Sequence, residues 1–132
     1  IPRRLRGGVS ALSIAAVTAA LTDGQPWLDE VLRYLQANRD FVRSHATANW
    51  PQAVHFPPQA TYLGWFDFRR YELSPSPYAF FLDHARVALG DGARFGDPGR
   101  ACVRLNFATS RSILEQITGR MDNALAAHPR ES

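Results

Sequence analysis

The sequence contains no lysine, and its fifteen basic residues other than histidine are all arginine. This absence excludes every mechanism that needs a lysine amine within this chain. The single cysteine, Cys102, excludes an intramolecular disulfide and predicts a reducing, cytoplasmic setting. No apolar run approaches the roughly 18 residues that a membrane span needs, and no stretch has the character of a secretory signal. We therefore expect no membrane partner.

The excess of positive charge is small. The 132 residues carry a net charge of +3, and the densest basic cluster is the short "RRLR" at residues 3–6. Because no stretch concentrates the charge further, we expect no nucleic-acid partner. A hydrophobic content of 45% with 20% charged residues is typical of one globular domain with its own core.

Two helices are predicted at the start of the chain. The alanine-rich stretch predicts a buried helix over about 10–22, with Ser10 as its N-cap and Gly24 as its stop. A long helix is predicted over 25–48, because Pro26 suits a first helical turn and apolar residues recur at helical spacing after it. The first helix and the start of the second would cover another sheet that this chain does not contain.

A strand and a third helix are predicted next. Three prolines within 51–58 exclude a helix there. The aromatic stretch 61–71 predicts a strand, and its near-continuous apolar character indicates cover on both faces. Residues 74–89 predict a helix with Ser76 as its cap and Pro77 at its first position.

A last strand and a last helix complete the predicted layer. The strand is expected over 101–108, and an amphipathic helix over 110–128, where Ser112 and Glu115 have the spacing of a capping box. The expected architecture is a small sheet covered by helices on one face, an α+β or α/β layer.

The last predicted strand carries an arginine among apolar residues. Val103, Leu105 and Phe107 alternate with Arg104, so the arginine belongs to the less apolar face. Its planar, five-donor guanidinium matches a carboxylate bidentately. The residues alone favour a structural salt bridge, and they leave open an anion-binding arginine held on a rigid sheet.

Other candidate chemistry is weak. The four histidines are scattered and Cys102 has no second cysteine, so no metal site is expected. No nucleophile elbow is present. The glycine-rich stretch 90–99 lies between a helix and a strand, the wrong order for a phosphate-binding turn, and is interpreted as turn chemistry. Asp67 is interpreted as a strand-end residue that makes local hydrogen bonds.

Several segments carry the pattern of a known family. The first comprises Pro58, Thr61, Tyr62, Leu63, Trp65 and Asp67; the second Phe80, Phe81, Leu82, Ala85, Val87 and Leu89; the third Gly92, Phe95 and Gly96, followed by "VRLNFA" at 103–108. With "QPWL" and "NRD" upstream, these segments resemble the C-terminal part of fold-type I pyridoxal-phosphate (PLP) enzymes. The closest resemblance is to the MalY/PatB-like cystathionine β-lyases (C–S lyases) of the class I/II aminotransferase superfamily, and it covers nearly the whole chain.

The resemblance implies roles for five residues. Arg104 would bind the α-carboxylate of an amino-acid substrate. Tyr62 and Asn106 would line the substrate site. Ser10 and Ser13 would lie in a loop near the subunit boundary of a homodimer.

The resemblance also implies a cofactor that this chain cannot hold covalently. In the family, PLP is attached to a lysine upstream of the matched region. We therefore expect the chain to be the C-terminal part of a longer enzyme, with no catalytic residue of its own and no activity alone. Residues 1–24 would be a remnant of the large domain, 25–48 a connecting helix, and 49–132 the small domain.

Three functions follow as hypotheses. The first is a PLP-dependent β-lyase that cleaves the Cβ–S bond of cystathionine or cysteine-type amino acids, giving pyruvate, ammonia and a thiol. An aminotransferase would use the same visible residues. A non-catalytic interaction module is the third, supported only by the mild basic charge and the basic "RRLR" at residues 3–6. We expect the isolated chain to self-associate, because the first two helices would expose apolar surface.

Overall fold

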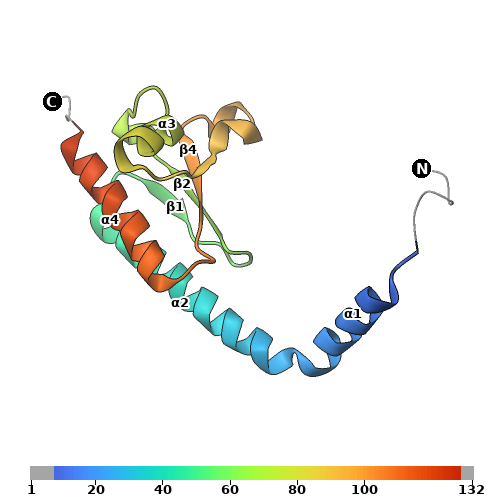
Figure 1. Ribbon diagram of the computed structural model, residues 1–132. Coiled ribbons are helices and arrows are strands. Elements are labelled where there is room, and N and C mark those ends of the chain that lie inside the picture. Colours follow the sequence, from blue (N-terminus) through green and yellow to red (C-terminus); the bar gives the residue numbers. More distant parts are fainter. Residues whose placement is uncertain (1–7, 129–132) are drawn as a thin grey trace. The chain divides into compact units, whose positions relative to one another are not determined.

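The computed structural model describes residues 8–128 (Figure 1). The chain divides into two compact units, residues 1–34 and 35–132. The division falls within the long helix α2 (Gln25–Asn49). Each unit is described by itself.

The first unit contains helix α1 (Ala11–Asp23), close to the predicted range. Ser10 is the N-cap, since its hydroxyl accepts a hydrogen bond from the Ser13 N–H at 3.0 Å. Gly24 ends the helix, but with a φ of −81° rather than a left-handed conformation. Every side chain of α1 is exposed among the described residues, so its predicted burial, against a sheet that this chain does not contain, stays a prediction. Its apolar residues lie on all sides of the helix rather than along one stripe.

The second unit is built on a four-stranded antiparallel sheet, which confirms the predicted α+β layer. Its strands are β1 (Val54–Phe56), β2 (Leu63–Asp67), β3 (Gly90–Asp91) and β4 (Cys102–Asn106), in the order β1-β2-β4-β3. Strand β4 lies between β2 and β3, antiparallel to both. Strand β1 was not predicted, because three residues between prolines carry too little pattern to indicate a strand.

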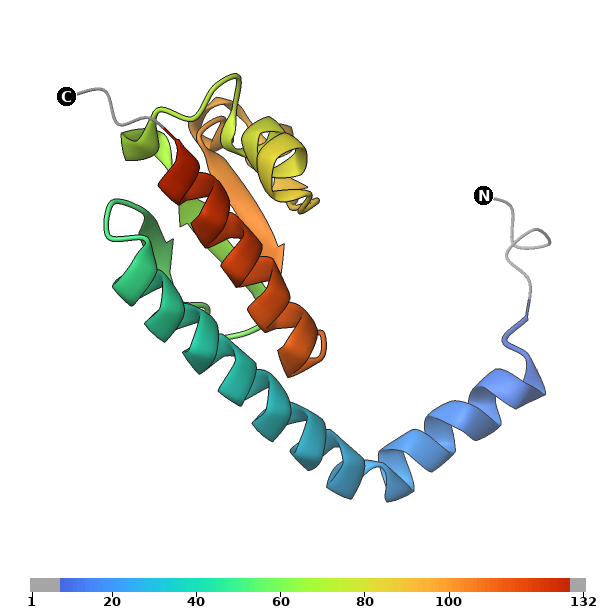
Figure 2. The ribbon, with the colours of Figure 1, turned by 60° about the vertical axis from the view of Figure 1, so that its left-hand side comes forward.

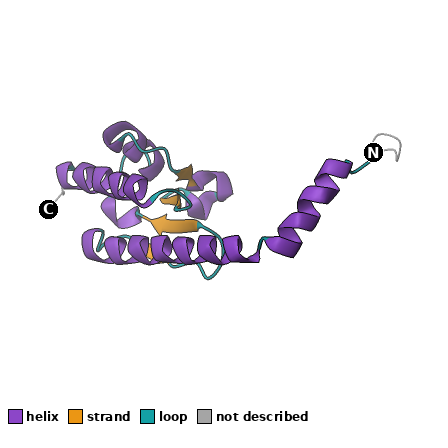
Figure 3. Ribbon diagram, turned by 60° about the horizontal axis from the view of Figure 1, so that its bottom comes forward, coloured by secondary structure: helices purple, strands orange, loops and turns teal. Residues whose placement is uncertain are grey.

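Two helices cover one face of this sheet. The second half of α2 and helix α4 (Arg111–Ala127) lie side by side on it (Figures 2 and 3). The core between these helices and the sheet includes Val42, Trp50, Phe66, Val103, Leu105, Leu114 and Met121. Asp122 of α4 joins the two helices, because it accepts hydrogen bonds from Trp50 Nε1 at 2.6 Å and His45 Nε2 at 3.0 Å.

The opposite face of the sheet is only partly covered. Strand β2 alternates between buried Phe66 and the partly exposed Leu63, Trp65 and Asp67. The prediction that this strand is covered on both faces is therefore wrong for the described residues. Asp67 makes the local contacts predicted for it, since its carboxylate accepts from the Arg69 N–H at 2.9 Å and pairs with the Arg69 guanidinium.

The segment before β3 is less helical than predicted. Helix α3 (Pro77–Phe80) begins as expected, with Ser76 accepting from the Ala79 N–H. One π-helical turn, η3 (Phe81–Ala85), follows and ends at Arg86, whose φ is 55°. The chain leaves the helix there and continues to β3, where Gly90 pairs with Arg104.

The glycine-rich stretch folds into turns, as predicted. Two short 3-10 turns, η4 (Gly92–Phe95) and η5 (Asp97–Gly99), follow β3. A third 3-10 turn, η2 (Arg69–Tyr71), follows β2. The predicted capping box at the start of α4 is wrong, because Ser110 rather than Ser112 is the N-cap and accepts from the Ile113 N–H.

Candidate functional site

The backbone of Arg104 is held from both sides. The residue lies opposite Trp65 of β2 and opposite Gly90 of β3. Its neighbours Val103 and Leu105 are buried in the core, which fixes the strand against α2 and α4. The side chain of Arg104 therefore emerges on the open face of the sheet from a rigid position.

No acidic partner neutralises this arginine within residues 8–128. Other arginines of the described chain form ion pairs: Arg39, Arg69 and Arg100 pair with Asp40, Asp67 and Asp97. The structural salt bridge that the sequence favoured for Arg104 is therefore wrong for this part of the chain. Its guanidinium instead lies over the ring of Phe95, with Cζ at 5.1 Å from the ring centroid.

Arg104 opens onto a hollow of about 340 Å³. The hollow is lined by Leu63, Val87, Ala88, Leu89, Gly90, Arg104, Leu105, Asn106, Ala108, Thr109 and Ile117. Asn106 lies two residues from Arg104 on the same face of β4, and its Oδ1 accepts the Ala108 N–H at 2.8 Å. The amide nitrogen of Asn106 therefore stays available to a ligand beside a free guanidinium.

The structure brings only two of the five predicted site residues together. Arg104 and Asn106 share the hollow, whereas Tyr62 is 46% exposed and is not one of the lining residues. The Tyr62 carbonyl accepts the Phe107 N–H at 3.0 Å, so its backbone rather than its ring supports the end of β4.

Ser10 and Ser13 belong to the first unit, and their local contacts explain both residues. Their hydroxyls lie 2.9 Å apart at the start of α1, where Ser10 is the N-cap. The subunit-boundary role that the resemblance implies for them stays a prediction.

Sequence reasoning gave no role to Phe95 or Gly90, which both lie against the Arg104 side chain. A Cβ on Gly90 would lie 3.2 Å from the Arg104 Nε, so the stem of the arginine runs across this glycine. A signal for Phe95 was present in the sequence, since Phe95 belongs to the family pattern with Gly92 and Gly96, whereas Gly90 does not. The pattern alone does not show which side chain they face.

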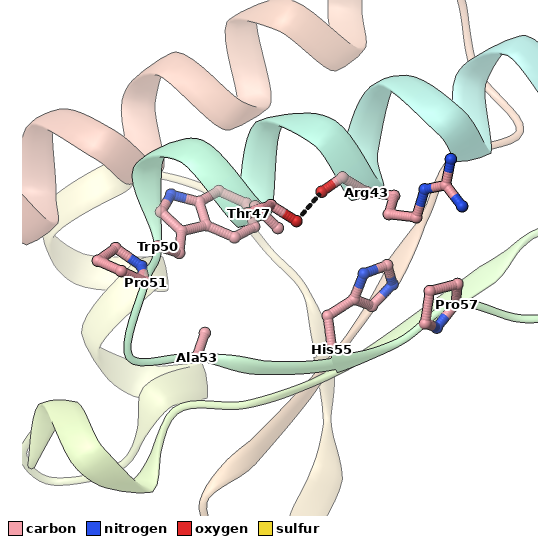
Figure 4. Close-up of a pocket in the computed structure, with 8 residues that line it drawn as sticks. Arg43, Thr47, Trp50, Pro51, Ala53, His55 and Pro57 are labelled. Atoms are coloured by element: carbon pink, nitrogen blue, oxygen red, sulfur yellow. Dashed lines mark hydrogen bonds between the residues drawn. The ribbon is translucent and has the colours of Figure 1, made fainter.

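A second hollow, also about 340 Å³, lies between the end of α2 and β1 (Figure 4). Arg43, Thr47 and Trp50 line it from the helix, and His55 from the strand. Burial, and secondly the charge of Arg43, lower the pKa of His55 below its usual value. The hydroxyl of Thr47 donates to the Arg43 carbonyl at 2.9 Å. This hollow thus offers one guanidinium and a neutral imidazole.

Metal and thiol chemistry find no support in the described chain. Among residues 8–128, no three histidine, cysteine or acidic side chains are grouped as metal ligands would be. Burial, and secondly the Asp67 carboxylate, raise the pKa of the Cys102 thiol, which keeps it in its unreactive protonated form. Within the same range, no helix is long and apolar enough to cross a bilayer.

Comparison with known proteins places this geometry in a family. The chain is 32% identical over 121 residues to the cystathionine β-lyase PatB of Bacillus subtilis, an alignment that covers 91% of the chain and 31% of PatB. It is 34% identical over 126 residues to the protein MalY of Escherichia coli, covering 92% of the chain and 32% of MalY. The chain is homologous to the C-terminal portion of the MalY/PatB-like cystathionine β-lyases.

A solved structure shows that this chain also shares the fold of that C-terminal portion. The PLP-bound C–S lyase of Staphylococcus hominis superimposes with a TM-score of 0.86 and 26% identity, over 96% of this chain and 34% of the enzyme. The chain spans about a third of the length of the relatives that it matches. No family model matches the chain.

Proposed function

We propose that this chain is the substrate-carboxylate-binding part of a longer PLP-dependent C–S β-lyase, in which Arg104 binds the α-carboxylate of the amino-acid substrate. The observation that carries the proposal is an arginine on a doubly paired strand that has no acidic partner among the described residues. Such a guanidinium keeps its hydrogen-bonding fork available for a bidentate carboxylate.

The residues of this chain do not supply the cofactor's covalent anchor. PLP is attached to enzymes through a lysine amine, and the chain has no lysine. When bound, the cofactor supplies an electron sink for chemistry at the substrate's Cα. In that chemistry this chain orients the substrate. A carboxylate bound to Arg104 limits the directions in which the substrate's Cα–H bond can point. We expect the chain alone neither to bind PLP covalently nor to release pyruvate.

The proposed enzyme cleaves the Cβ–S bond of cystathionine or a cysteine-type amino acid and gives pyruvate, ammonia and a thiol. Its homologues include a named cystathionine β-lyase and a named C–S lyase, which supports this reaction. The cytoplasmic location predicted from the single cysteine belongs to the same proposal.

The domain layout and partners of the enzyme are also part of the proposal. Residues 1–24 would belong to the large domain, 25–48 to the connecting helix and 49–132 to the small domain, within a homodimer. Helix α1 exposes apolar side chains, including Leu12, Val17 and Leu21. We therefore expect the isolated chain to self-associate. Sedimentation velocity of the isolated chain measures this, and a monodisperse monomer would contradict it.

The deciding experiment uses the complete enzyme with PLP and cystathionine, without a ketoacid, and follows pyruvate and free thiol together. Equal amounts of both products establish the lyase. Amino-group transfer that needs an added ketoacid makes the protein an aminotransferase instead. If the enzyme catalyses neither reaction with any amino-acid substrate tried, that result would favour an interaction module.

The role of Arg104 is tested in the same assay. The Arg104→Gln variant should raise KM about 10- to 150-fold, because charged hydrogen bonds contribute about 1.5–3 kcal/mol. Arg120→Gln is the matched control, since Arg120 is exposed on α4 and should leave KM unchanged. An unchanged KM for Arg104→Gln would refute the carboxylate role.

A further inference from the structure

The pairing of β4 fixes the backbone of Arg104, but not its guanidinium. An arginine side chain has several rotatable bonds and substantial rotamer entropy. A carboxylate neighbour commonly orders such a group, but Arg104 has no ion pair within residues 8–128. Another contact must therefore set the direction in which its N–H groups point.

Two residues of the glycine-rich stretch make that contact. The stem of Arg104 crosses Gly90, where an added Cβ would lie 3.1 Å from the arginine Cβ. The guanidinium then lies over Phe95, with 5.1 Å between Cζ and the ring centroid. Gly90 thus provides the path of the side chain, and Phe95 provides the surface on which its charged end rests.

The ring of Phe95 is itself supported. It meets Trp65 edge-to-face, at 5.4 Å between centroids and an interplanar angle of 86°. Trp65 is the residue directly opposite Arg104 in the β2–β4 pairing. Arg104, Trp65 and Phe95 therefore form one cluster on the open face of the sheet, anchored by backbone pairing.

The 3-10 turn η4, which carries Phe95, begins after the N-cap residue Asp91 and ends at Gly96. Asp91 accepts the Ala93 N–H at 3.0 Å, which starts η4. Gly96 has a φ of 108°, a conformation that favours glycine, and ends it. An added Cβ on Gly92 would collide with the Cys102 carbonyl oxygen at 2.4 Å, so the turn packs directly against the start of β4.

The acids of this turn are engaged elsewhere. The Asp91 carboxylate caps η4, and the Asp97 carboxylate pairs with Arg100 at 2.8 Å. The stretch therefore presents an aromatic face to Arg104 and no negative charge. A π contact leaves the in-plane N–H donors free, whereas a carboxylate would occupy two of them.

We propose that Phe95 is a positioning residue, which orients the Arg104 guanidinium for a substrate carboxylate without using its hydrogen-bond donors. The glycine-rich stretch 90–99 is then the support of the carboxylate-binding arginine. This proposal rests on the proposed function of Arg104.

The test compares Phe95→Leu, Phe95→Met and Phe95→Tyr in the complete, PLP-loaded enzyme. Leucine and methionine remove the π face and should raise KM about two- to fivefold with kcat unchanged. Tyrosine keeps the ring and should restore the wild-type KM. Phe56→Leu is the matched control, because Phe56 is an exposed phenylalanine of β1 that lies opposite Trp65, one strand further from Arg104 than Trp65 is. Its KM should equal that of the wild type.

A double-mutant cycle separates positioning from a general structural effect. If Phe95 acts through Arg104, the Phe95→Leu change should cost nothing further in kcat/KM when Arg104→Gln is already present. A loss that persists in that background, or a wild-type KM for both Phe95→Leu and Phe95→Met, would overturn the positioning role. An Arg104→Gln variant with normal KM would instead overturn the proposed function on which it rests.

Discussion

Gly90 lies directly opposite Arg104 across the β3–β4 pairing, and the space above its Cα holds the stem of the arginine. A Gly90→Ala substitution places a methyl group 3.1 Å from the Arg104 Cβ and 3.2 Å from its Nε. The arginine side chain must then give way by a few tenths of an ångström, and a displacement that takes a χ angle off its rotamer costs about 0.5–1.5 kcal/mol. We expect KM for the amino-acid substrate to rise about two- to tenfold, measured by steady-state kinetics of the complete enzyme.

Gly119→Ala is the control for that substitution. An added Cβ on Gly119, within α4, meets no atom within 4 Å. Alanine should therefore stabilise the helix by about 0.5–1 kcal/mol and leave KM unchanged. Equal KM values for the two alanine variants would show that the path of the arginine across Gly90 has no effect on binding.

The buried environment of His55 predicts that the free energy of unfolding decreases in mild acid. Its ring stacks on Phe66, with centroids 4.2 Å apart, and burial followed by the Arg43 charge lowers its pKa below the usual 6.5. The unfolded chain therefore binds this proton more readily than the folded chain. The contribution of His55 to stability is complete above about pH 6.5 and decreases as the pH falls towards the lower pKa of the folded state.

The measurement is urea unfolding at pH 8 and pH 5.5, for the wild type and His55→Phe. Phenylalanine keeps the ring on Phe66 and cannot take up a proton, so this variant should lose less free energy of unfolding between the two pH values. Arg43→Gln removes the second cause alone, and should move the pKa of His55 part of the way back in an NMR titration. An equal acid loss in wild type and His55→Phe would contradict the assignment.

Local chemistry made much of the fold predictable. The caps at Ser10 and Ser76 depend on side chains three residues or fewer from their targets, so the sequence alone indicates them. The choice between Ser110 and Ser112 at the start of α4 depends on where the preceding loop is held, which is a tertiary contact. The burial of α1 stays a prediction for a related reason, since apolar composition does not show which part of a protein covers a helix.

Local sequence pattern likewise predicted only part of the candidate site. Alternation along β4 predicted that Arg104 faces away from Val103 and Leu105, and the pairing confirms it. Whether a carboxylate meets the guanidinium depends on residues distant in sequence or separated by turns, and no spacing rule contains that information. The aromatic contact with Phe95 depends on η4 folding back beside β4, which no local spacing indicates.

Asn38 tethers α2 to the end of the strand that carries Arg104. It is fully buried, and its Nδ2 donates to the carbonyls of Phe107 and Thr109, both at 2.9 Å. Asn38→Leu keeps the approximate volume but leaves both carbonyls unpaired, which should lower the free energy of unfolding by about 2–5 kcal/mol in urea. Asn123→Leu, on the exposed side of α4, should change it by less than about 0.5 kcal/mol. A loss below about 1 kcal/mol for Asn38→Leu would mean that the two carbonyls find other donors, and that the end of β4 does not depend on this tether.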